Sequence, residues 1–348
     1  MSDTAETIQT RLLANISDDY DKTEGSFFYD AEMPVAIELA NAYADQEEIL
    51  DKGFASTSTG SYLDKIVAEQ GITRKAAVSA TTTVTITGSE GSSISIGDLV
   101  STDTVNFAAT ENKTIAAGAT TMLVTVKCAT AGIVGNVIAG AIKYFPVTLA
   151  GLTAVTNASA VTNGYDEESD AELRIRYYEK VQSPATSGNS IQYKLWAKSV
   201  TGVGDAKIFP LWNGNGTVKV LLINSNKREA DSTLIDTVST YIEGVRPIGA
   251  TVTVGSAVEK AIDLEATLTL QIGYVLEDVQ SAIETALTSH LANIAFADSY
   301  VSYAKVGSLI LDIDGVLDYI GLTLNGAAAN VIIADVEVAV LGVVSVSG

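Results

Sequence analysis

The stretch NGYDEESDAELRIRYYEKVQSPATSGNSIQYKLWA, residues 163–197, decides how the second half of this 348-residue chain is interpreted. Five acidic side chains lie between Asp166 and Glu172, and two arginines follow. Ser169 and Glu172 have the spacing of a capping box, in which each side chain caps the other residue's backbone N–H. Acids in the first turn and bases further along suit the helix macrodipole. We therefore predict a helix over residues 170–182, with an apolar stripe of Leu173, Tyr177 and Val181.

The same acidic cluster has a second interpretation as a divalent-ion site, because adjacent carboxylates can supply the oxygen ligands that Ca²⁺ prefers. Acids at the first turn of a helix are common, and a capped helix accounts for every residue of this cluster. We prefer the helix, and for the whole chain we predict no catalytic, cofactor-binding or metal-binding residues and no cofactor. Calorimetric titration with Ca²⁺ distinguishes the two interpretations.

The charge of the chain limits its partners. It has 42 acidic and 21 basic residues, a net charge of −21, which repels phosphate groups and disfavours nucleic acid and anionic membranes. Residues 1–75 have 15 acids and 6 bases, residues 76–162 have 4 and 3, and residues 163–348 have 23 and 12. The nearly uncharged middle segment is rich in Thr, Ser, Ala, Gly and Val, and this change in composition marks domain boundaries.

Other global features exclude whole classes of protein. The single cysteine excludes an internal disulfide, and the first residues lack the basic and apolar regions of a signal peptide. The longest apolar tract, residues 336–346, is too short to span a bilayer and contains Glu337. The mean hydropathy of +0.25 is high for so acidic a chain, so we expect some apolar surface to be buried against partner chains.

Residues 1–78 have a helical period. Pro34 suits a first helical turn, where its missing N–H costs little. The apolar residues that follow recur at spacings of three, four and seven: Val35, Leu39, Ala42, Tyr43, Ile49, Leu50 and Phe54. A second helix is expected from a box-like cap of Ser61 and Asp64 to a C-terminal Gly71. Its expected apolar face consists of Leu63, Ile66 and Val67.

Residues 79–162 change to a period of two, which predicts an antiparallel β domain. The residues expected on its buried face are Val84 with Ile86, Ile94 with Ile96, and Met122, Val124, Val126 and Cys128. Gly-rich turns such as TAGIVGNVIAG connect the strands.

Residues 163–258 and 259–348 alternate between helical and strand patterns, which predicts two α+β units, each a small sheet covered on one side by helices. In the first unit we expect helices at 170–182, 190–200 and 232–243 and strands at 205–209, 217–223 and 251–254. In the second we expect helices at 276–293 and 301–313 and strands at 262–272, 317–324 and 331–341. The predicted fold class is α+β multidomain, with a helical N-terminal region and an antiparallel β domain first.

Six pieces of the sequence, in this order, resemble the baseplate J-like family, the baseplate wedge proteins of contractile phage tails and phage-tail-like bacteriocins. The pieces are GSFFYD (25–30), TSTGSYLDKIVAEQGITRKAA (57–77), TAGIVGNVIAG (130–140), NGYDEESDAELRIRY with SGNSIQYKLWA (163–177 and 187–197), RPIGATVTV (246–254) and GVLDYIGLTLNG (315–326).

The resemblance implies a structural role without catalysis. Family members form part of a six-fold baseplate ring in several copies, and they rearrange when the tail contracts. The implied partners are other baseplate wedge proteins, sheath-initiator and hub-proximal proteins, and copies of the chain itself, with no nucleic acid and no membrane insertion. The implied location is the baseplate of a virion or tail-like particle assembled in the bacterial host cytoplasm. Obligate contacts of this kind bury about 2,000 Å² or more, so we expect the purified chain to self-associate.

An enzymatic alternative is a metal-dependent phosphatase. LILDIDGVL, residues 309–317, resembles the first motif of haloacid-dehalogenase-type phosphatases, with Asp312 as nucleophile and Asp314 as general acid. That chemistry also needs a later lysine, and no Lys or Arg follows Lys305. We prefer a helix that ends near Asp314, with Gly315 turning the chain into the next strand.

The remaining candidates also have structural interpretations. His290 is the only histidine, and a cation late in a helix suits the macrodipole. Cys128 is expected to be a buried core residue rather than a nucleophile. Trp196 and Trp212 are either interface anchors or core residues, and NGNG at 213–216 predicts a hairpin turn. A glycosidase and a Thr/Ser-rich surface adhesin are further alternatives; carboxylate pairs occur in any acidic chain, and the lack of a signal peptide disfavours export.

Overall fold

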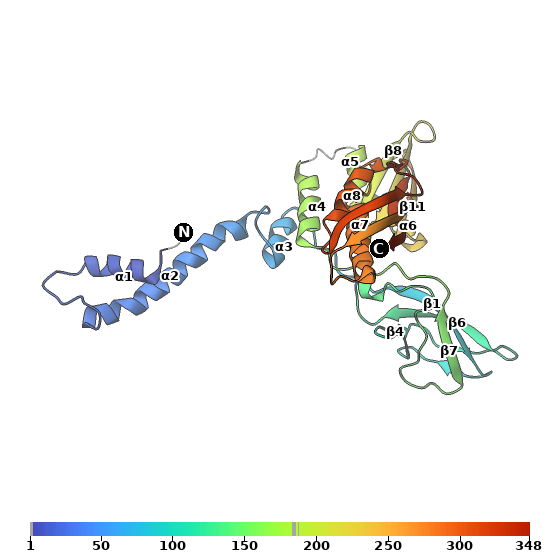
Figure 1. Ribbon diagram of the computed structural model, residues 1–348, viewed down its shortest axis with the longest axis horizontal. Helices are drawn as coiled ribbons and strands as arrows, with labels where there is room; N and C mark the ends of the chain where they lie inside the picture. The colour runs from blue at the N-terminus through green and yellow to red at the C-terminus, as the bar shows by residue number, and fades with distance from the viewer. Residues whose placement is uncertain (1–2, 183–185, 187) are drawn as a thin grey trace. The chain divides into compact units, whose positions relative to one another are not determined.

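The computed structural model describes residues 3–182, 186 and 188–348 (Figure 1). Residues 183–185 and 187, which include the first residue of the SGNSIQYKLWA piece, lie outside the described residues. The chain forms two compact units, Met1–Arg74 with Glu168–Gln182, and Lys75–Glu167 with Ser183–Gly348. Within the described part of the chain, no helix is both long enough and apolar enough to cross a membrane.

The first unit contains four helices: α1 (Ala5–Ala14), α2 (Phe27–Gly53), α3 (Gly60–Ala68) and α4 (Asp170–Gln182). The hydroxyls of Thr4 and Ser26 cap α1 and α2 by accepting hydrogen bonds from backbone N–H groups. Helix α1 lies along the first half of α2 (Figure 1). Their contact buries Ile8 and Ala36.

Two expectations for this region are wrong. Helix α2 begins at Phe27, so Pro34 lies inside it rather than in its first turn, because the Ser26 cap starts the helix earlier. The proposed cap of Ser61 and Asp64 does not form: Thr59 is the N-cap residue, and Asp64 accepts a hydrogen bond from Arg74 instead. The predicted apolar face of α3 is confirmed, because Leu63 and Val67 are fully buried.

The predicted apolar face of α2 lacks a cover in the described structure. Ile49, Leu50 and Phe54 are 62%, 67% and 61% exposed. Tyr43 lies two turns before Leu50 on the same face of the helix and is 37% exposed. We call these four residues the α2 stripe.

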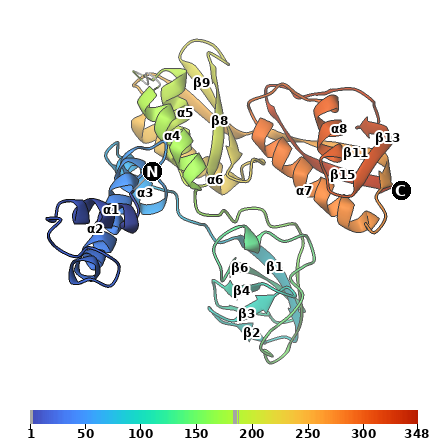
Figure 2. The same ribbon diagram turned by 60° about the vertical axis from the view of Figure 1, so that its left-hand side comes forward.

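The antiparallel β domain is a five-stranded sheet in the order β3-β4-β6-β1-β7, curled into a nearly closed barrel (Figure 2). Its strands are β1 (Thr81–Gly88), β3 (Leu99–Ser101), β4 (Asn106–Ala109), β6 (Thr121–Cys128) and β7 (Leu152–Asn157). A separate pair, β2 (Ser93–Ile94) with β5 (Lys113–Thr114), and the 3₁₀ helix η1 (Ile133–Gly135) complete it. Strand β6 alternates strictly between exposed and buried residues, which confirms the predicted period of two.

Ile96 is an exception to the predicted buried face of the barrel, because it is 64% exposed. The carboxylate of Asp98 accepts a hydrogen bond from the Ser95 N–H at 2.7 Å. Gly97 adopts a positive φ of 92°. This turn ends strand β2 at Ile94, so the alternation does not continue to Ile96.

The next sheet has the order β10-β9-β8, from β8 (Val203–Pro210), β9 (Thr217–Asn224) and β10 (Thr251–Ser256). Strands β8 and β9 form the predicted hairpin, and β9 and β10 are parallel. Helices α5 (Ser190–Ser199) and α6 (Ser232–Val245) cover one face (Figure 2). On the other face, Leu221 and Ile223 pack against Val338 and Val340.

The C-terminal sheet has the order β13-β11-β15. Its strands are β11 (Val258–Leu270), β13 (Val316–Leu324) and β15 (Glu337–Ser347), and its helices are α7 (Leu276–Ile294) and α8 (Tyr303–Leu311). The strand predicted over 331–341 is divided into β14 (Val331–Ile332), which pairs with β12 (Tyr300–Val301), and β15. A turn divides the two strands: the Glu337 N–H donates to the Ala334 carbonyl, and the Glu337 carboxylate accepts from the Ala334 N–H.

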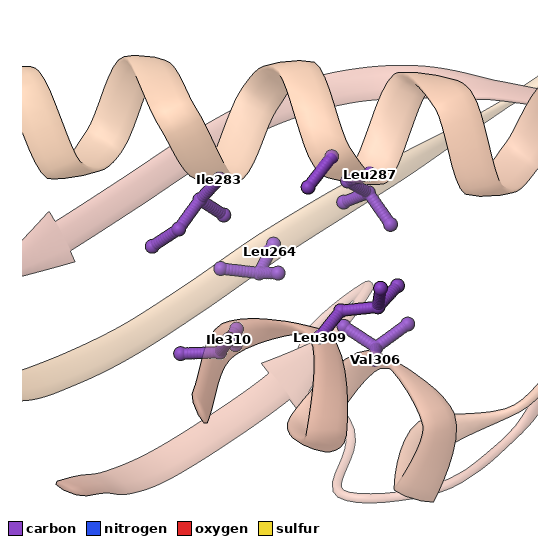
Figure 3. Close-up of a pocket in the computed structure, with 7 residues that line it drawn as sticks. Leu264, Ile283, Leu287, Val306, Leu309 and Ile310 are labelled. Atoms are coloured by element: carbon purple, nitrogen blue, oxygen red, sulfur yellow. The ribbon is translucent and has the colours of Figure 1, made fainter. Parts of the chain in front are cut away.

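Side chains from α7, α8 and β11 converge in the core of this region (Figure 3). Ile283 and Leu287 of α7 lie opposite Val306 and Ile310 of α8, with Leu264 of β11 beside them. They enclose an apolar cavity of about 10 Å³. That volume is about one water molecule, and an apolar cavity of this kind stays dry.

Candidate functional site

The acidic cluster of residues 166–172 begins helix α4 as predicted. The Ser169 N–H donates to Glu172 Oε2 at 3.2 Å, and the Glu172 N–H donates to Ser169 Oγ at 3.3 Å. The capping box is therefore formed in both directions. Asp166, Glu168 and Asp170 of the cluster make other contacts, which the prediction of a helix start did not include.

Glu168 forms a buried ion pair with Arg176. Arg176 donates from Nε to Glu168 Oε1 at 2.8 Å and from Nη2 to Glu168 Oε2 at 2.6 Å. The two side chains are 7% and 10% exposed. Arg176 Nη2 also donates to the Thr73 carbonyl at 2.7 Å. Two parallel bonds fix the guanidinium plane, so this pair ties α4 to the segment that follows α3.

Arg74 makes a second set of bonds in the same unit. Its guanidinium donates to Asp64 at 2.8 Å, to Asp170 at 2.6 Å and to the Glu168 carbonyl at 2.7 Å. The Gly60 N–H also donates to the Asp170 carboxylate at 3.0 Å. That hydrogen bond, and the adjacent Arg74, hold the pKa of Asp170 below its usual value. Asp170 therefore stays ionised and joins the start of α3 to the start of α4.

The basic residues of α4 bind backbone carbonyls rather than only complementing the macrodipole. Arg174 donates to the carbonyls of Ala55 at 2.6 Å and Ser58 at 2.8 Å. Leu173 is fully buried among Leu63 and Val67 of α3. We call the contacts of α4 with residues 55–74 the helix junction. The sequence prediction missed Arg74, although Arg74 lies in the TSTGSYLDKIVAEQGITRKAA piece of the resemblance.

In the second unit, the first residues of the opening stretch form a different junction. Asn163 accepts a hydrogen bond from the Thr81 N–H at 2.9 Å and donates to the Thr81 carbonyl at 3.1 Å. The Asn136 side chain exchanges two hydrogen bonds with the backbone of Gly164, at 3.0 and 2.8 Å. Asp166 accepts from the Ile133 N–H at 2.8 Å. We call residues 78–81, 132–136 and 162–166 the neck.

The neck explains why TAGIVGN and NGYD carry the residues that they do. A Cβ on Gly135 would lie 2.7 Å from the Ala80 Cβ and 2.8 Å from the Cys128 Cβ. Gly132 adopts a φ of 115° against the Asp166 carboxylate, a conformation that favours glycine. Two motifs that are distant in sequence thus meet where the chain enters and leaves the barrel.

The neck also bonds to the sheet of β8, β9 and β10. Asn226, just after β9, donates to the carbonyls of Thr162 at 3.1 Å and Gly164 at 3.0 Å. Lys75, which precedes the neck, donates to the Val203 carbonyl at 2.8 Å. Burial, reinforced by the charge of Asp231, raises the pKa of Tyr165 to about 12. Tyr165 is therefore neutral at physiological pH.

The structure does not bring together the parts of a phosphatase site. Asp312 and Asp314 are both exposed at the end of α8. Asp312 is the C-cap residue, and Gly315 turns the chain with a φ of 91°, which agrees with the structural interpretation. Among the residues that the structure describes, no group of three or more His, Cys, Asp or Glu side chains could hold a metal ion.

His290 is not the helix-end cation that the sequence suggested. Its Nε2 atom is buried and has no hydrogen-bond partner in the described structure. Burial, and to a lesser extent the nearby Lys305, lower its pKa. His290 is therefore predominantly neutral at pH 7, and the prediction of a cation is wrong.

The two tryptophans differ, and Cys128 is a core residue. Trp196 of α5 is half-buried and packs edge-on against Tyr193, with ring centroids 5.1 Å apart, at the margin of the core between α5 and the sheet. Trp212 is 46% exposed at the β8–β9 turn. Cys128 is 2% exposed in the barrel core.

The polar groups described for the helix junction and the neck bind backbone and side chains of the same chain.

Comparisons with known proteins agree on the family. Residues 83–164 match the Baseplate J-like protein barrel domain, residues 185–256 the Baseplate J-like central domain, and residues 262–347 the Baseplate J-like protein C-terminal domain.

Individual relatives span much or nearly all of the chain. The phage-like element PBSX protein XkdT of Bacillus subtilis is 36% identical over 99% of this chain and 97% of its own length. The baseplate protein gp47 of Escherichia phage Mu is 29% identical over 70% of this chain and 71% of its own length. A chain of the cryo-EM structure of the anti-feeding prophage (AFP) baseplate aligns over 99% of this chain and 98% of that one, with 9% identity and a TM-score of 0.38. On the three matched domains and the full-length likeness to XkdT, the chain belongs to the Baseplate J-like family.

Proposed function

We propose that this chain is a wedge component of the baseplate of a contractile tail, in a phage or a phage-tail-like bacteriocin. Membership of the Baseplate J-like family supports a structural role in a phage baseplate, and the baseplate protein of phage Mu is among the relatives. In this role the chain is not an enzyme. It acts by holding neighbouring proteins in a ring and by changing its contacts when the tail contracts.

The observation that carries the proposal is the α2 stripe. Large apolar side chains that are exposed along the second half of a 27-residue helix and at its C-cap, as in the α2 stripe, are unfavourable in an isolated chain. Exposed apolar patches of this kind mark interaction surfaces. The helix junction supports the same role, because it holds the segment around α3, which follows α2 in sequence, with one buried and one half-buried ion pair.

The partners that we propose are other wedge proteins, sheath-initiator and hub-proximal proteins, and further copies of this chain. We place it in the baseplate of the particle, assembled in the cytoplasm of the bacterial host. We also propose that residues 1–78, 79–162, 163–258 and 259–348 act as four modules, of which the first provides docking contacts.

The α2 stripe gives a direct test of the assembly role. In a strain that produces the particle, Leu50→Glu should abolish or strongly reduce assembled tails seen by electron microscopy, because it places a charge in the apolar contact. The matched control is Asn41→Glu. It adds the same charge to an exposed site nine residues away, on the opposite side of the helix, and should leave assembly unchanged. Normal tails in the Leu50→Glu strain would contradict the proposal.

A further inference from the structure

Three large apolar side chains are exposed at one end of the sheet of β8, β9 and β10. Leu211 and Trp212, in the β8–β9 turn, are 62% and 46% exposed, and Ile248, in the loop before β10, is 106% exposed. The two loops are adjacent, because the Thr251 N–H donates to the Gly216 carbonyl at 2.8 Å. We call Leu211, Trp212 and Ile248 the apolar tip.

The backbone beneath the apolar tip is held by its own hydrogen bonds. The Leu211 N–H donates to the Thr217 carbonyl at 2.7 Å, and the Thr217 hydroxyl donates to the Gly214 carbonyl at 2.7 Å. Leu211 adopts a φ of 57°, unusual for a residue with a side chain. Arg246 donates to the Ala250 carbonyl and fixes the second loop. A rigid loop that presents a tryptophan and aliphatic side chains loses little entropy on binding, which is a property of interface anchors.

A positive charge lies beside the apolar tip, in a chain whose net charge is −21. Residues 206–228 contain four basic residues and no acid, but Lys227 and Arg228 follow β9 at the end of the sheet opposite to the apolar tip. Lys207 and Arg228 form ion pairs with Asp335 and Glu259. Lys219 lies over the Trp212 ring, 5.6 Å from its centroid, and the structure gives it no carboxylate partner within the described residues. The apolar tip therefore presents apolar surface with a positive charge beside it.

The α2 stripe has the complementary character. Its apolar residues Tyr43, Ile49, Leu50 and Phe54 are exposed. The four acids Asp45, Glu47, Glu48 and Asp51 lie among them, against one base, Lys52, which pairs with Glu48 at 2.6 Å. An apolar surface with acidic neighbours suits an apolar surface that carries a lysine.

We propose that the apolar tip of one copy of this chain docks against the α2 stripe of a second copy. This inference rests on the proposed function, since it names the partner surface in an assembly of copies. The contact is heterologous: two different surfaces meet, so each copy offers one free surface of each kind to the next. Contacts of this type close into rings when the rotation between copies allows it.

The test uses the full-length chain and two variants, each of which removes one surface. Trp212→Ala with Ile248→Ser removes the apolar tip, and Ile49→Ser with Leu50→Ser removes the α2 stripe. Ile272→Ser is the matched control, because Ile272 is 101% exposed but lies after β11, outside both surfaces. Sedimentation velocity at about 1 to 100 µM covers the affinities of ordinary protein contacts, and circular dichroism verifies that each variant is folded.

The parent chain and Ile272→Ser should self-associate equally. Each double variant alone should associate about tenfold or more weakly, since truncation of an anchor tryptophan has effects of this size. A mixture of the two double variants should form a one-to-one complex, because one still has the α2 stripe and the other still has the apolar tip. Lys219→Glu should weaken self-association. A higher salt concentration should weaken self-association of the parent chain, because salt screens the attraction between Lys219 and the acids of the α2 stripe.

Three results would overturn the proposal. The parent chain could remain monomeric at about 100 µM. The variant without the apolar tip could associate as tightly as the parent, which would indicate that α2 pairs with α2. The mixture could fail to form a complex, which would show that the two surfaces are not partners. None of these results removes the chain from the tail particle, so the proposed function is tested separately by its presence there.

Discussion

Glu168 and Arg176 lie eight residues apart and form a two-bond ion pair at 2.8 and 2.6 Å, with side chains only 7% and 10% exposed. The pair closes the start of α4 back onto the middle of the same helix and onto the Thr73 carbonyl. A buried carboxylate and a buried guanidinium are tolerated here because each satisfies the other. The helix junction therefore depends on both partners being present.

Removing one partner of this pair should weaken the helix junction. We expect Glu168→Gln to lower the free energy of opening α3 and α4 by about 3–5 kcal/mol, because it leaves Arg176 buried without its countercharge. Hydrogen exchange of the α3 and α4 amides measures this opening. The control Glu167→Gln changes an exposed neighbour and should alter the exchange by less than about 0.5 kcal/mol. Equal exchange in the two variants would contradict the role given to the ion pair.

Gly135 should tolerate no side chain. We expect Gly135→Ala to destabilise the barrel by about 1–3 kcal/mol, because its Cβ would collide with Ala80 and Cys128. Chemical denaturation followed by hydrogen exchange of the β1 and β6 amides reports on the barrel. Gly255→Ala is the control, since nothing lies within 4 Å of the Cβ that it would add. If Gly135→Ala behaves like Gly255→Ala, the packing described for the neck is wrong.

The C-terminal core should be sensitive at Leu287. Leu287→Ala enlarges the cavity between α7, α8 and β11 (Figure 3) and should cost about 2–5 kcal/mol. Leu311→Ala removes the same atoms from a side chain that is 47% exposed and should cost clearly less. Urea unfolding measured by exchange of the α7 amides compares the two. A smaller loss for Leu287→Ala than for Leu311→Ala would argue against the observed packing.

His290 should make the free energy of unfolding depend on pH between about pH 7 and pH 5. Its folded pKa lies below the unfolded value of about 6.5, so the unfolded chain binds more protons as the pH falls through that range. The free energy of unfolding should therefore decrease as the pH falls from 7 toward 5, and level off below the folded pKa. Two charged groups act on the His290 pKa: Lys305 lowers it and Asp298 raises it, while burial has the largest effect and lowers it.

His290→Gln tests this dependence, because His290 is the only histidine and carboxylates titrate at lower pH. The variant should lose most of the slope between pH 7 and about pH 5 in the exchange of the α7 and α8 amides. An unchanged slope would show that another group is responsible.

Local signals predicted much of the fold. Helix α4 has the bounds that its capping box and apolar period indicated, and β6 shows the alternation read from Met122 to Cys128. These features depend on residues a few positions apart, so the sequence contains all of the information that they need. The hairpin at residues 213–216 belongs to the same class.

The features that were missed depend on long-range contacts. Arg74 binds Asp170, 96 residues away, and no local pattern indicates that pairing. The period of α2 predicted an apolar face, but Ile49, Leu50 and Phe54 of that face are exposed in the described structure, because periodicity identifies a face and not its partner. The predicted 331–341 strand is divided by a turn in which the N–H and the carboxylate of Glu337 bind the carbonyl and the N–H of Ala334. His290 was misassigned because burial, rather than helix position, controls its pKa.

Whether this chain is a structural part of a tail baseplate is tested most directly by its presence in the particle. The measurement is quantitative mass spectrometry of gradient-purified contractile tails from the producing strain, with this chain compared to the sheath protein. We predict that the chain co-sediments with intact tails at a low, fixed ratio to sheath. Its absence from intact particles would contradict a structural role in the baseplate.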